Sequence, residues 1–303
     1  MRKENSFETN CTMKKIVVTA SNRGIGFSFV QTYLKNANNF VIATCRDPQS
    51  AFQLQELQKS NSNQMQILPI DFHDESSIEE ASRTIKEQHS TIDILLNVPG
   101  ILKPEKSLQM IDIKVLEEVF KTNCFVIHPF SHSKLVRNLN ASLSSQGHLL
   151  MMKHFQELLS RKVKGKPEEV GSQELGKIVN ISARVGSIGD NNIGGWYSYR
   201  SSKTALNQMT KCAALELKRK GVVVVSLHPG TVRTDFTKVS LSPYSCFVSA
   251  QSFLPSKKPY ITPTKQGVLE PSESTEKLAN IINNLTLADT GKFVDQDNKM
   301  IEW

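Results

Sequence analysis

Short, continuously apolar runs alternate with helical patterns through the first third of the chain, and this alternation constrains the fold most strongly. The runs are rich in Val, Ile and Leu, as is typical of strands buried on both faces. The predicted strands occupy residues 15–19, 39–46, 66–71 and 92–97. The helical patterns between them occupy residues 27–35, 53–59 and 76–87. Such repeats build an α/β fold, a doubly wound parallel sheet with helices on both faces.

The same alternation continues to the end of the chain. Further strands are predicted at residues 177–182, 222–228 and 291–295. Further helices are predicted at residues 110–124 and 199–219 and within 268–284. Residues 1–13 carry no apolar core and are expected to form a disordered tail. We therefore predict a single domain over residues 14–303.

Composition limits the class and the compartment of the protein. Hydrophobic residues make up 39% and charged residues 22%, as in ordinary globular proteins. No apolar run approaches the about 20 residues that span a bilayer, and residues 1–13 do not form a secretory signal. The 5 cysteines are scattered without a C-x-x-C pair. We therefore expect a cytoplasmic protein with no membrane partner and no metal site.

The formal net charge of +8 allows two interpretations. A basic surface for nucleic acid is one, but the Lys and Arg residues are spread out and do not interleave with aromatic residues. Attraction of an anionic cofactor or substrate explains the sign equally well. We therefore expect no nucleic-acid partner.

A glycine pair follows the first predicted strand directly. Gly24 and Gly26 lie between that strand and the first helical pattern. Backbone N–H groups at such a helix start point outward, and the helix dipole favours a phosphate there. The strand, glycine turn and helix together predict a dinucleotide site.

The end of the second predicted strand indicates which dinucleotide binds. Arg46 stands where an acidic residue would select a free ribose 2′-hydroxyl, whereas a cation suits a 2′-phosphate. Arg23 offers a second positive charge, and Asp71 ends the third strand where it could meet the adenine. NADP(H) is therefore favoured over NAD(H). The alternative is that both arginines are merely solvated.

Tyr199 and Lys203 stand four positions apart at the head of a helical pattern and therefore share one helix face. A neighbouring ammonium favours phenolate over phenol, which would lower the pKa of Tyr199 and suit it to proton transfer with a carbonyl. An exposed Tyr and Lys with no such role are the simpler alternative. Ser182 ends the fifth strand, at the sheet edge where ligands bind, and Asn123 lies near a helix end.

Several motifs in the right order resemble the short-chain dehydrogenase/reductase superfamily. The resemblance runs from about Lys15 to the carboxyl end, and its motifs are Thr19–Gly26, Asn97–Gly100, Asn123, Tyr199-x-x-x-Lys203 and Pro229-Gly230. The segments 182–191 and 194–203, together with the ending 297–303, resemble the branch that holds bacterial C-factor and its carbonyl-reductase-like relatives. The resemblance implies a seven-stranded Rossmann sheet, a small carbonyl substrate and a possible homo-oligomer.

The resemblance also implies a role for each matching residue. Tyr199 would protonate the carbonyl oxygen, Lys203 would hold the nicotinamide ribose, Ser182 would hydrogen-bond the substrate oxygen, and Asn123 would support a proton-relay water. The implied cofactor contacts are Thr19, Asn22, Arg23, Gly24, Ile25, Gly26, Arg46, Asp71, Phe72, Asn97, Gly100, Tyr199, Lys203, Pro229, Gly230 and Val232.

Four departures from the family pattern stand out. Ala20 replaces the first glycine of the turn, which requires a negative φ at that residue. Val98 and Pro99 replace an Asn-Ala pair. Ala183 replaces the second Ser of a Ser-Ser pair, so Ser182 or Ser187 would have to serve. Residues 131–148 and 239–257 are predicted to be insertions.

These observations leave more than one function open. The first is an NADPH-dependent reductase that converts an aldehyde or ketone to an alcohol, with Tyr199 as general acid. The second is a catalytically impaired Rossmann protein that senses a cofactor or takes part in signalling. A nucleic-acid-binding protein is a third interpretation.

Overall fold

The computed structural model describes residues 13–124, 147–160, 175–237 and 267–303. Most of the predicted tail and the predicted insertions lie outside the described residues. Gly147 and His148, which the sequence assigned to an insertion, are instead the buried first residues of a helix. Their burial places them in the core of the domain.

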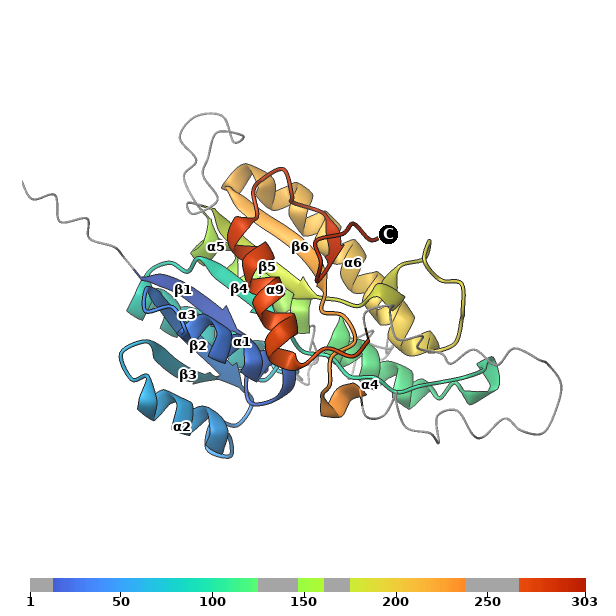
Figure 1. Cartoon of the computed structure of the whole chain (residues 1–303), viewed down its shortest axis with the longest axis horizontal. Helices are drawn as coiled ribbons and strands as arrows, with labels where there is room; N and C mark the ends of the chain where they lie inside the picture. Colours follow the sequence, from blue (N-terminus) through green and yellow to red (C-terminus); the bar gives the residue numbers. More distant parts are fainter. Residues whose placement is uncertain (1–12, 125–146, 161–174, 238–266) are drawn as a thin grey trace, which may run out of the picture.

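A parallel seven-stranded sheet of order β3-β2-β1-β4-β5-β6-β7 forms the centre of the molecule, which confirms the predicted α/β class (Figure 1). Its strands are β1 (Lys14–Val18), β2 (Asn39–Cys45), β3 (Met65–Pro69), β4 (Ile94–Asn97), β5 (Gly176–Ile181), β6 (Val222–His228) and β7 (Phe293–Asp295). Every strand pair is parallel.

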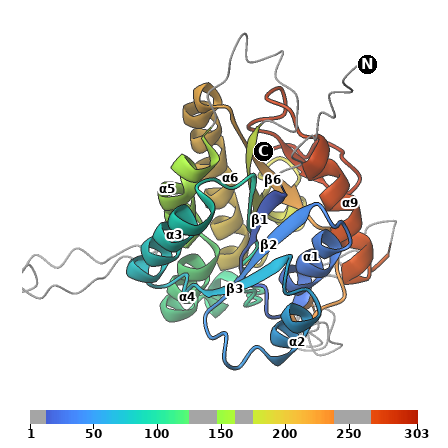
Figure 2. The ribbon, with the colours of Figure 1, turned by 90° about the vertical axis from the view of Figure 1, so that its left-hand side faces the viewer.

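Helices cover both faces of this sheet (Figure 2). One face carries α1 (Gly24–Leu34), α2 (Phe52–Ser60) and α9 (Pro271–Asn284). The other carries α3 (Glu75–His89), α4 (Ile113–Asn123), α5 (Gly147–Leu159) and α6 (Tyr197–Leu217). Short 3-10 turns lie at Leu108–Met110, Arg184–Gly186 and Lys218–Lys220.

The valine-rich strand β6 shows why the strands of this sheet are continuously apolar. Val223 and Val225 pack into the core on the side of α1 and α9, whereas Val222 and Val224 pack into the core on the side of α5 and α6. Successive side chains of a strand point to opposite faces, so both sets need apolar residues.

The order in which strands are added to the sheet reverses between the neighbouring strands β1 and β4. From β1 the chain moves outward through β2 and β3, and it then crosses to β4 on the other side of β1. Ligands of open parallel sheets bind outside the carboxyl ends of the strands at such a point. The fold thus locates the site before any side chain is considered.

Helix α3 begins at Glu75, and the Asp74 carboxylate caps it by accepting from the Ser76 amide. The prediction for the turn after β1 is wrong. Ala20 has a φ of +50°, not the negative value that a side chain prefers. The amide of the next residue, Ser21, donates to the Thr44 carbonyl at 2.8 Å, and this contact with β2 helps to hold the turn.

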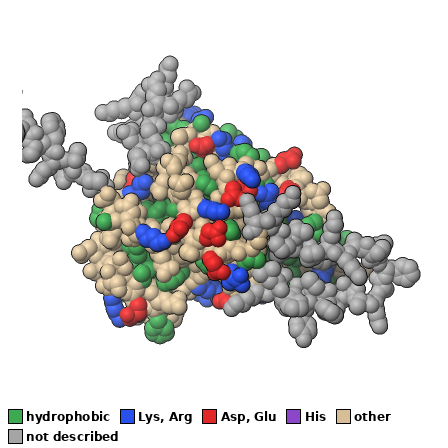
Figure 3. All heavy atoms as spheres, viewed as in Figure 1, with side chains coloured by type: hydrophobic (Ala, Val, Ile, Leu, Met, Phe, Trp, Pro, Cys, Tyr) green, Lys and Arg blue, Asp and Glu red, His purple; other side chains and the backbone are tan. Residues whose placement is uncertain are grey.

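Charged side chains of both signs share the face of the molecule in Figure 3, where Lys and Arg are interspersed with Asp and Glu. In the part of the chain that the structure describes, no helix is long and apolar enough to cross a membrane. The same residues contain no group of three His, Cys, Asp or Glu side chains arranged to hold a metal.

Candidate active site

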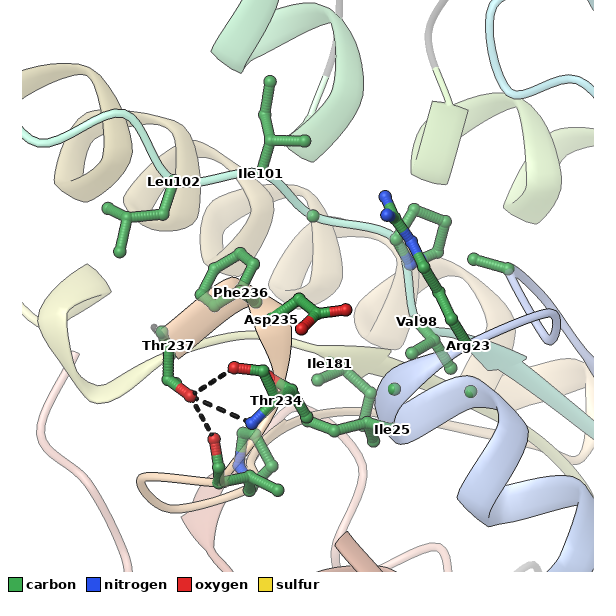
Figure 4. Close-up of a pocket in the computed structure, with 18 of the residues that line it drawn as sticks. Arg23, Ile25, Val98, Ile101, Leu102, Ile181, Thr234, Asp235, Phe236 and Thr237 are labelled. Atoms are coloured by element: carbon green, nitrogen blue, oxygen red, sulfur yellow. Dashed lines mark hydrogen bonds between the residues drawn. The ribbon is translucent and has the colours of Figure 1, made fainter. Parts of the chain in front are cut away.

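A cavity of roughly 1680 Å³ opens over the carboxyl ends of the strands. Its wall combines the turn after β1 with the ends of β2, β4, β5 and β6 and the first turn of α6. Figure 4 shows Ile25, Val98 and Ile181 on one side of this cavity and Ile101, Leu102 and Phe236 on another. The volume exceeds the usual 300–1,000 Å³ of small-ligand pockets and suits a dinucleotide together with a substrate.

The turn after β1 is packed too tightly to admit a side chain at Gly26. A Cβ there would lie 2.3 Å from the Ala20 carbonyl oxygen. Thr19 fixes the turn from below, because its hydroxyl donates to the Leu96 carbonyl and accepts from the Val98 amide, both at 2.9 Å. The start of α1 therefore faces the cavity with exposed backbone, as a phosphate site requires.

Two arginines and one aspartate line the part of the cavity near the ends of β1, β2 and β3. Arg46 at the end of β2 and Arg23 in the turn both line the cavity, and Arg23 extends across it in Figure 4. Asp71 also lines it, with one carboxylate oxygen held by the His73 amide at 2.9 Å. Phe72 lies beside Asp71 and packs edge-on against His148.

Tyr199 and Lys203 lie on the cavity wall one turn apart on α6. Both are buried, and the Lys203 ammonium donates to the Ile181 carbonyl at 2.9 Å. The expected lowering of the Tyr199 pKa is wrong, because burial instead raises it. Burial also lowers the pKa of Lys203 to about 8. A phenol is already protonated at neutral pH, and burial of Tyr199 favours that form, which a proton donor needs.

Glu105, in the segment after β4, holds the start of α6 in place. Its carboxylate accepts from the Ser198 amide at 3.2 Å and from the Ser198 hydroxyl, and its carbonyl accepts from the Trp196 amide at 2.6 Å. Trp196, with a φ of +51°, provides no side-chain cap of its own. A carboxylate at a helix start satisfies the free amides and complements the helix dipole.

Replacing Glu105 should therefore destabilise the protein. We expect Glu105→Ala to lower the free energy of unfolding by about 2 kcal/mol, because the buried Ser198 amide loses its acceptor. Urea denaturation measures this change, and exposed Glu117→Ala on α4 serves as the control. A loss equal to that of the control would contradict the capping role.

The hydrogen bonding of Ser182 does not match its expected role as donor to a substrate. Its hydroxyl donates to the Asn207 side-chain oxygen at 2.7 Å. Ser187, the other candidate, is buried, and its hydroxyl accepts from the Asp190 amide at 3.0 Å. Ala183 instead packs with Tyr199, Trp196 and Leu102.

Three residues predicted to serve the cofactor or the proton relay do not line the cavity. Thr19 binds the β4 end as described, and Asn97 donates to Asn180 at 2.9 Å within the core. Asn123 accepts from the Ile101 amide at 2.7 Å and donates to its carbonyl and to the Ser202 hydroxyl. These side chains hold β4, α4 and α6 together beneath the site.

The segment after β6 completes the wall. Pro229, Gly230 and Val232, which the resemblance implies as cofactor contacts, line the cavity, and so do Asn22, Gly24, Ile25 and Gly100. The Thr237 hydroxyl contacts the Thr234 amide and carbonyl and the Val232 carbonyl (Figure 4). This turn places Phe236 with its ring centroid 5.8 Å from that of Tyr199.

Sequence reasoning missed Glu105, Asn207 and Phe236. Asn207 lies one turn beyond Lys203, so its position on the active face of α6 was a signal that could have been read. Glu105 and Phe236 lie in irregular segments, where spacing carries no such information.

Comparison with known proteins assigns the chain to a family. A short chain dehydrogenase model matches residues 14–148 and 142–244, which together exceed half of the chain. The chain belongs to the short chain dehydrogenase family. Members of this family are oxidoreductases that use a nicotinamide cofactor and act on small molecules.

Individual relatives cover nearly the whole chain. An uncharacterized oxidoreductase of Schizosaccharomyces pombe, C24B10.20, is 29% identical over 93% of this chain and 94% of its own. The carbonyl reductase Sniffer of D. melanogaster shares 25% identity, with a TM-score of 0.73 over 96% of this chain and all of its own (100%). The NADPH-bound carbonyl reductase from chicken fatty liver shares 28% identity, with a TM-score of 0.71 over 96% and 99%.

Proposed function

We propose that this protein reduces a carbonyl group to an alcohol with NADPH and that Tyr199 is the proton donor. The observation that carries the proposal is the position of Tyr199 and Lys203 on the wall of the same cavity as the glycine turn. The similar structures of a carbonyl reductase from D. melanogaster and of one from chicken support the reaction class.

The residues around the cavity fit a nicotinamide dinucleotide phosphate. The exposed backbone at the start of α1 suits the pyrophosphate, and Arg46 and Arg23 suit the 2′-phosphate. Pro229, Gly230 and Val232 suit the nicotinamide end. When bound, this cofactor supplies the hydride, and the protein supplies orientation and the proton.

The chain itself supplies the acid. Tyr199 is protonated at neutral pH, as any phenol with a pKa of about 10 or higher is, and it can give that proton to a carbonyl oxygen as negative charge develops there. Lys203 lies one turn away and places an ammonium beneath the reacting groups. The phenol is surrounded by the apolar side chains of Leu102, Trp196 and Phe236. They limit water in the site, which strengthens the hydrogen bond between the phenol and a carbonyl oxygen.

The choice of cofactor can be tested by thermal unfolding. We expect NADPH to raise the melting temperature more than NADH does, because a ligand stabilises the folded state in proportion to its affinity. Arg46→Ala should weaken NADPH binding about tenfold and leave NADH binding nearly unchanged, since only the 2′-phosphate needs the cation.

Arg219→Ala is the matched control for Arg46→Ala. It removes the same charge at the 3-10 turn that precedes β6, at the opposite edge of the sheet. Equal shifts with NADPH and NADH would contradict the NADP preference, and no shift with either would contradict the enzymatic function.

A further inference from the structure

The Tyr199 hydroxyl is the donor that a substrate oxygen would meet in this cavity. Burial raises the pKa of this hydroxyl. Among the described residues, neither a charged group nor a hydrogen-bond partner contributes to the shift. The aromatic rings of Trp196 and Phe236 lie 6.3 Å and 5.8 Å from its ring. The phenol is therefore available to a substrate within an apolar enclosure.

The position beside Tyr199 at the end of β5 carries a methyl group. Ala183 follows directly after Ser182, lines the cavity and packs in the same apolar cluster as Tyr199. Successive residues of an extended segment point in opposite directions, and Ala183 has an extended backbone (φ −148°, ψ 145°). Both residues line the cavity, but the Ser182 hydroxyl is turned toward Asn207 of α6, whereas Ala183 presents only a methyl group.

Ser182 has no proton left for a substrate. A serine hydroxyl has one proton, and this one is donated to the Asn207 oxygen at 2.7 Å. The orientation of the Asn207 amide is fixed from its other end, because its nitrogen donates to the Gly186 carbonyl at 3.3 Å. A flipped amide would place its oxygen against that carbonyl oxygen.

Neighbouring cations are also engaged by the protein. The Arg200 guanidinium donates to the carbonyls of Val185, Gly194 and Gly195. Arg184 pairs with Asp190 at 3.2 Å and with Asp295 at 2.8 Å. Both guanidinium groups beside Ala183 are therefore held by carbonyl or carboxylate oxygens of the protein.

We propose that the site stabilises the developing oxyanion with one hydroxyl only, that of Tyr199, and therefore selects electron-poor carbonyls, specifically vicinal diketones with apolar substituents. This inference rests on the proposed reductase function and deepens it. The carbon–oxygen π bond breaks as the carbon receives hydride from NADPH and the oxygen receives the Tyr199 proton, which yields a hydroxyketone and NADP⁺. An adjacent carbonyl withdraws charge from the oxyanion, so such a substrate needs less help from the protein.

The apolar enclosure indicates the substituents. The phenol is surrounded by uncharged side chains, those of Leu102, Val185, Trp196 and Phe236. Phenyl or alkyl groups on either side of the reacting carbonyl would bury against them, and each buried methylene gains about 0.8 kcal/mol. Ala183 is thus a specificity-determining residue for this site.

Benzil and deoxybenzoin provide a matched substrate pair, because they differ only in the second carbonyl. We expect the wild-type protein to reduce benzil with a kcat/KM at least about a hundredfold above that for deoxybenzoin, since one oxyanion donor is worth a factor of about 100 to 1,000. Ala183→Ser should raise kcat/KM for deoxybenzoin at least about tenfold. Ala183→Cys, with a similar volume and a weak donor, should not.

A second readout is independent of turnover. The carbonyl stretching frequency of deoxybenzoin bound together with NADP⁺ reports the hydrogen bonds to its oxygen. It should fall further in Ala183→Ser than in the wild type or Ala183→Cys. Ser182→Ala should lower kcat for benzil by less than about tenfold, as expected for loss of a bond between β5 and α6 rather than of an oxyanion donor.

Three results would overturn the inference. They are an equal preference for the two substrates in the wild type, no gain and no frequency change in Ala183→Ser, or a loss of more than about a hundredfold in a folded Ser182→Ala. If NADPH does not raise the wild-type melting temperature, the proposed function fails as well. A cofactor shift with any of the first three results would leave the proposed function standing and reject the single-donor site.

Discussion

Tyr199→Phe should abolish nearly all carbonyl reduction while leaving the fold and cofactor binding intact. The substitution removes only the phenol oxygen, whose proton is the one that the site offers to a carbonyl. General acid catalysis contributes roughly 100-fold to 10,000-fold, so kcat should fall by that factor. NADPH oxidation with benzil measures the loss, and the NADPH-induced rise in melting temperature shows that the site still binds its cofactor.

Tyr197→Phe is the matched control, because it makes the same change two residues earlier on α6. Tyr197 is not among the residues that line the cavity. Turnover by Tyr199→Phe within about tenfold of the wild type would exclude Tyr199 as the proton donor. Loss of both turnover and cofactor binding would show that the substitution had disturbed the fold.

Gly26→Ala should have the largest effect on cofactor binding. Its Cβ would lie 2.3 Å from the Ala20 oxygen and 2.9 Å from the carbonyl carbon, both backbone atoms that cannot rotate away. The turn or the start of α1 would have to move, and we expect a loss of about 3 kcal/mol in stability. The displaced amides would no longer fit a pyrophosphate, so NADPH should give no thermal shift.

Gly194→Ala is the control that distinguishes steric clash of an added Cβ from strain of the backbone conformation. Gly194 has a φ of +72°, but a Cβ added there would have no neighbouring atom within 4 Å, so alanine meets only the conformational penalty. That penalty is about 1 kcal/mol. Equal losses for Gly26→Ala and Gly194→Ala, with cofactor binding retained in both, would contradict the close packing of the turn.

The sheet was predictable because its central strands, such as β4, β5 and β6, are buried on both faces. The run of four valines at Val222–Val225 is typical of such a strand, and the structure reproduces the predicted strand β6. The glycine turn and the Tyr199–Lys203 pair were predictable for a related reason. Each depends on contacts within a few residues of the chain, so spacing alone describes it.

The failures have the opposite cause. The partner of Ser182 is Asn207, which lies 25 positions further along the chain, and no local pattern shows where that hydroxyl points. Ala20 adopts a positive φ within a turn bound to β2, although its own preference is different. The pKa of Tyr199 rises because three-dimensional packing removes water, an effect that the spacing to Lys203 does not contain.

The grip of Glu105 on both Trp196 and Ser198 ties the loop beyond β4 to the helix that bears Tyr199. The same loop supplies Ile101 and Leu102 to the cavity wall. A ligand that displaces this wall must therefore also displace the first turn of α6, because the Glu105 hydrogen bonds connect the two. Tyr199 and the wall formed by Ile101 and Leu102 would therefore move together, so the distance between the phenol and this wall would be kept for substrates of different sizes.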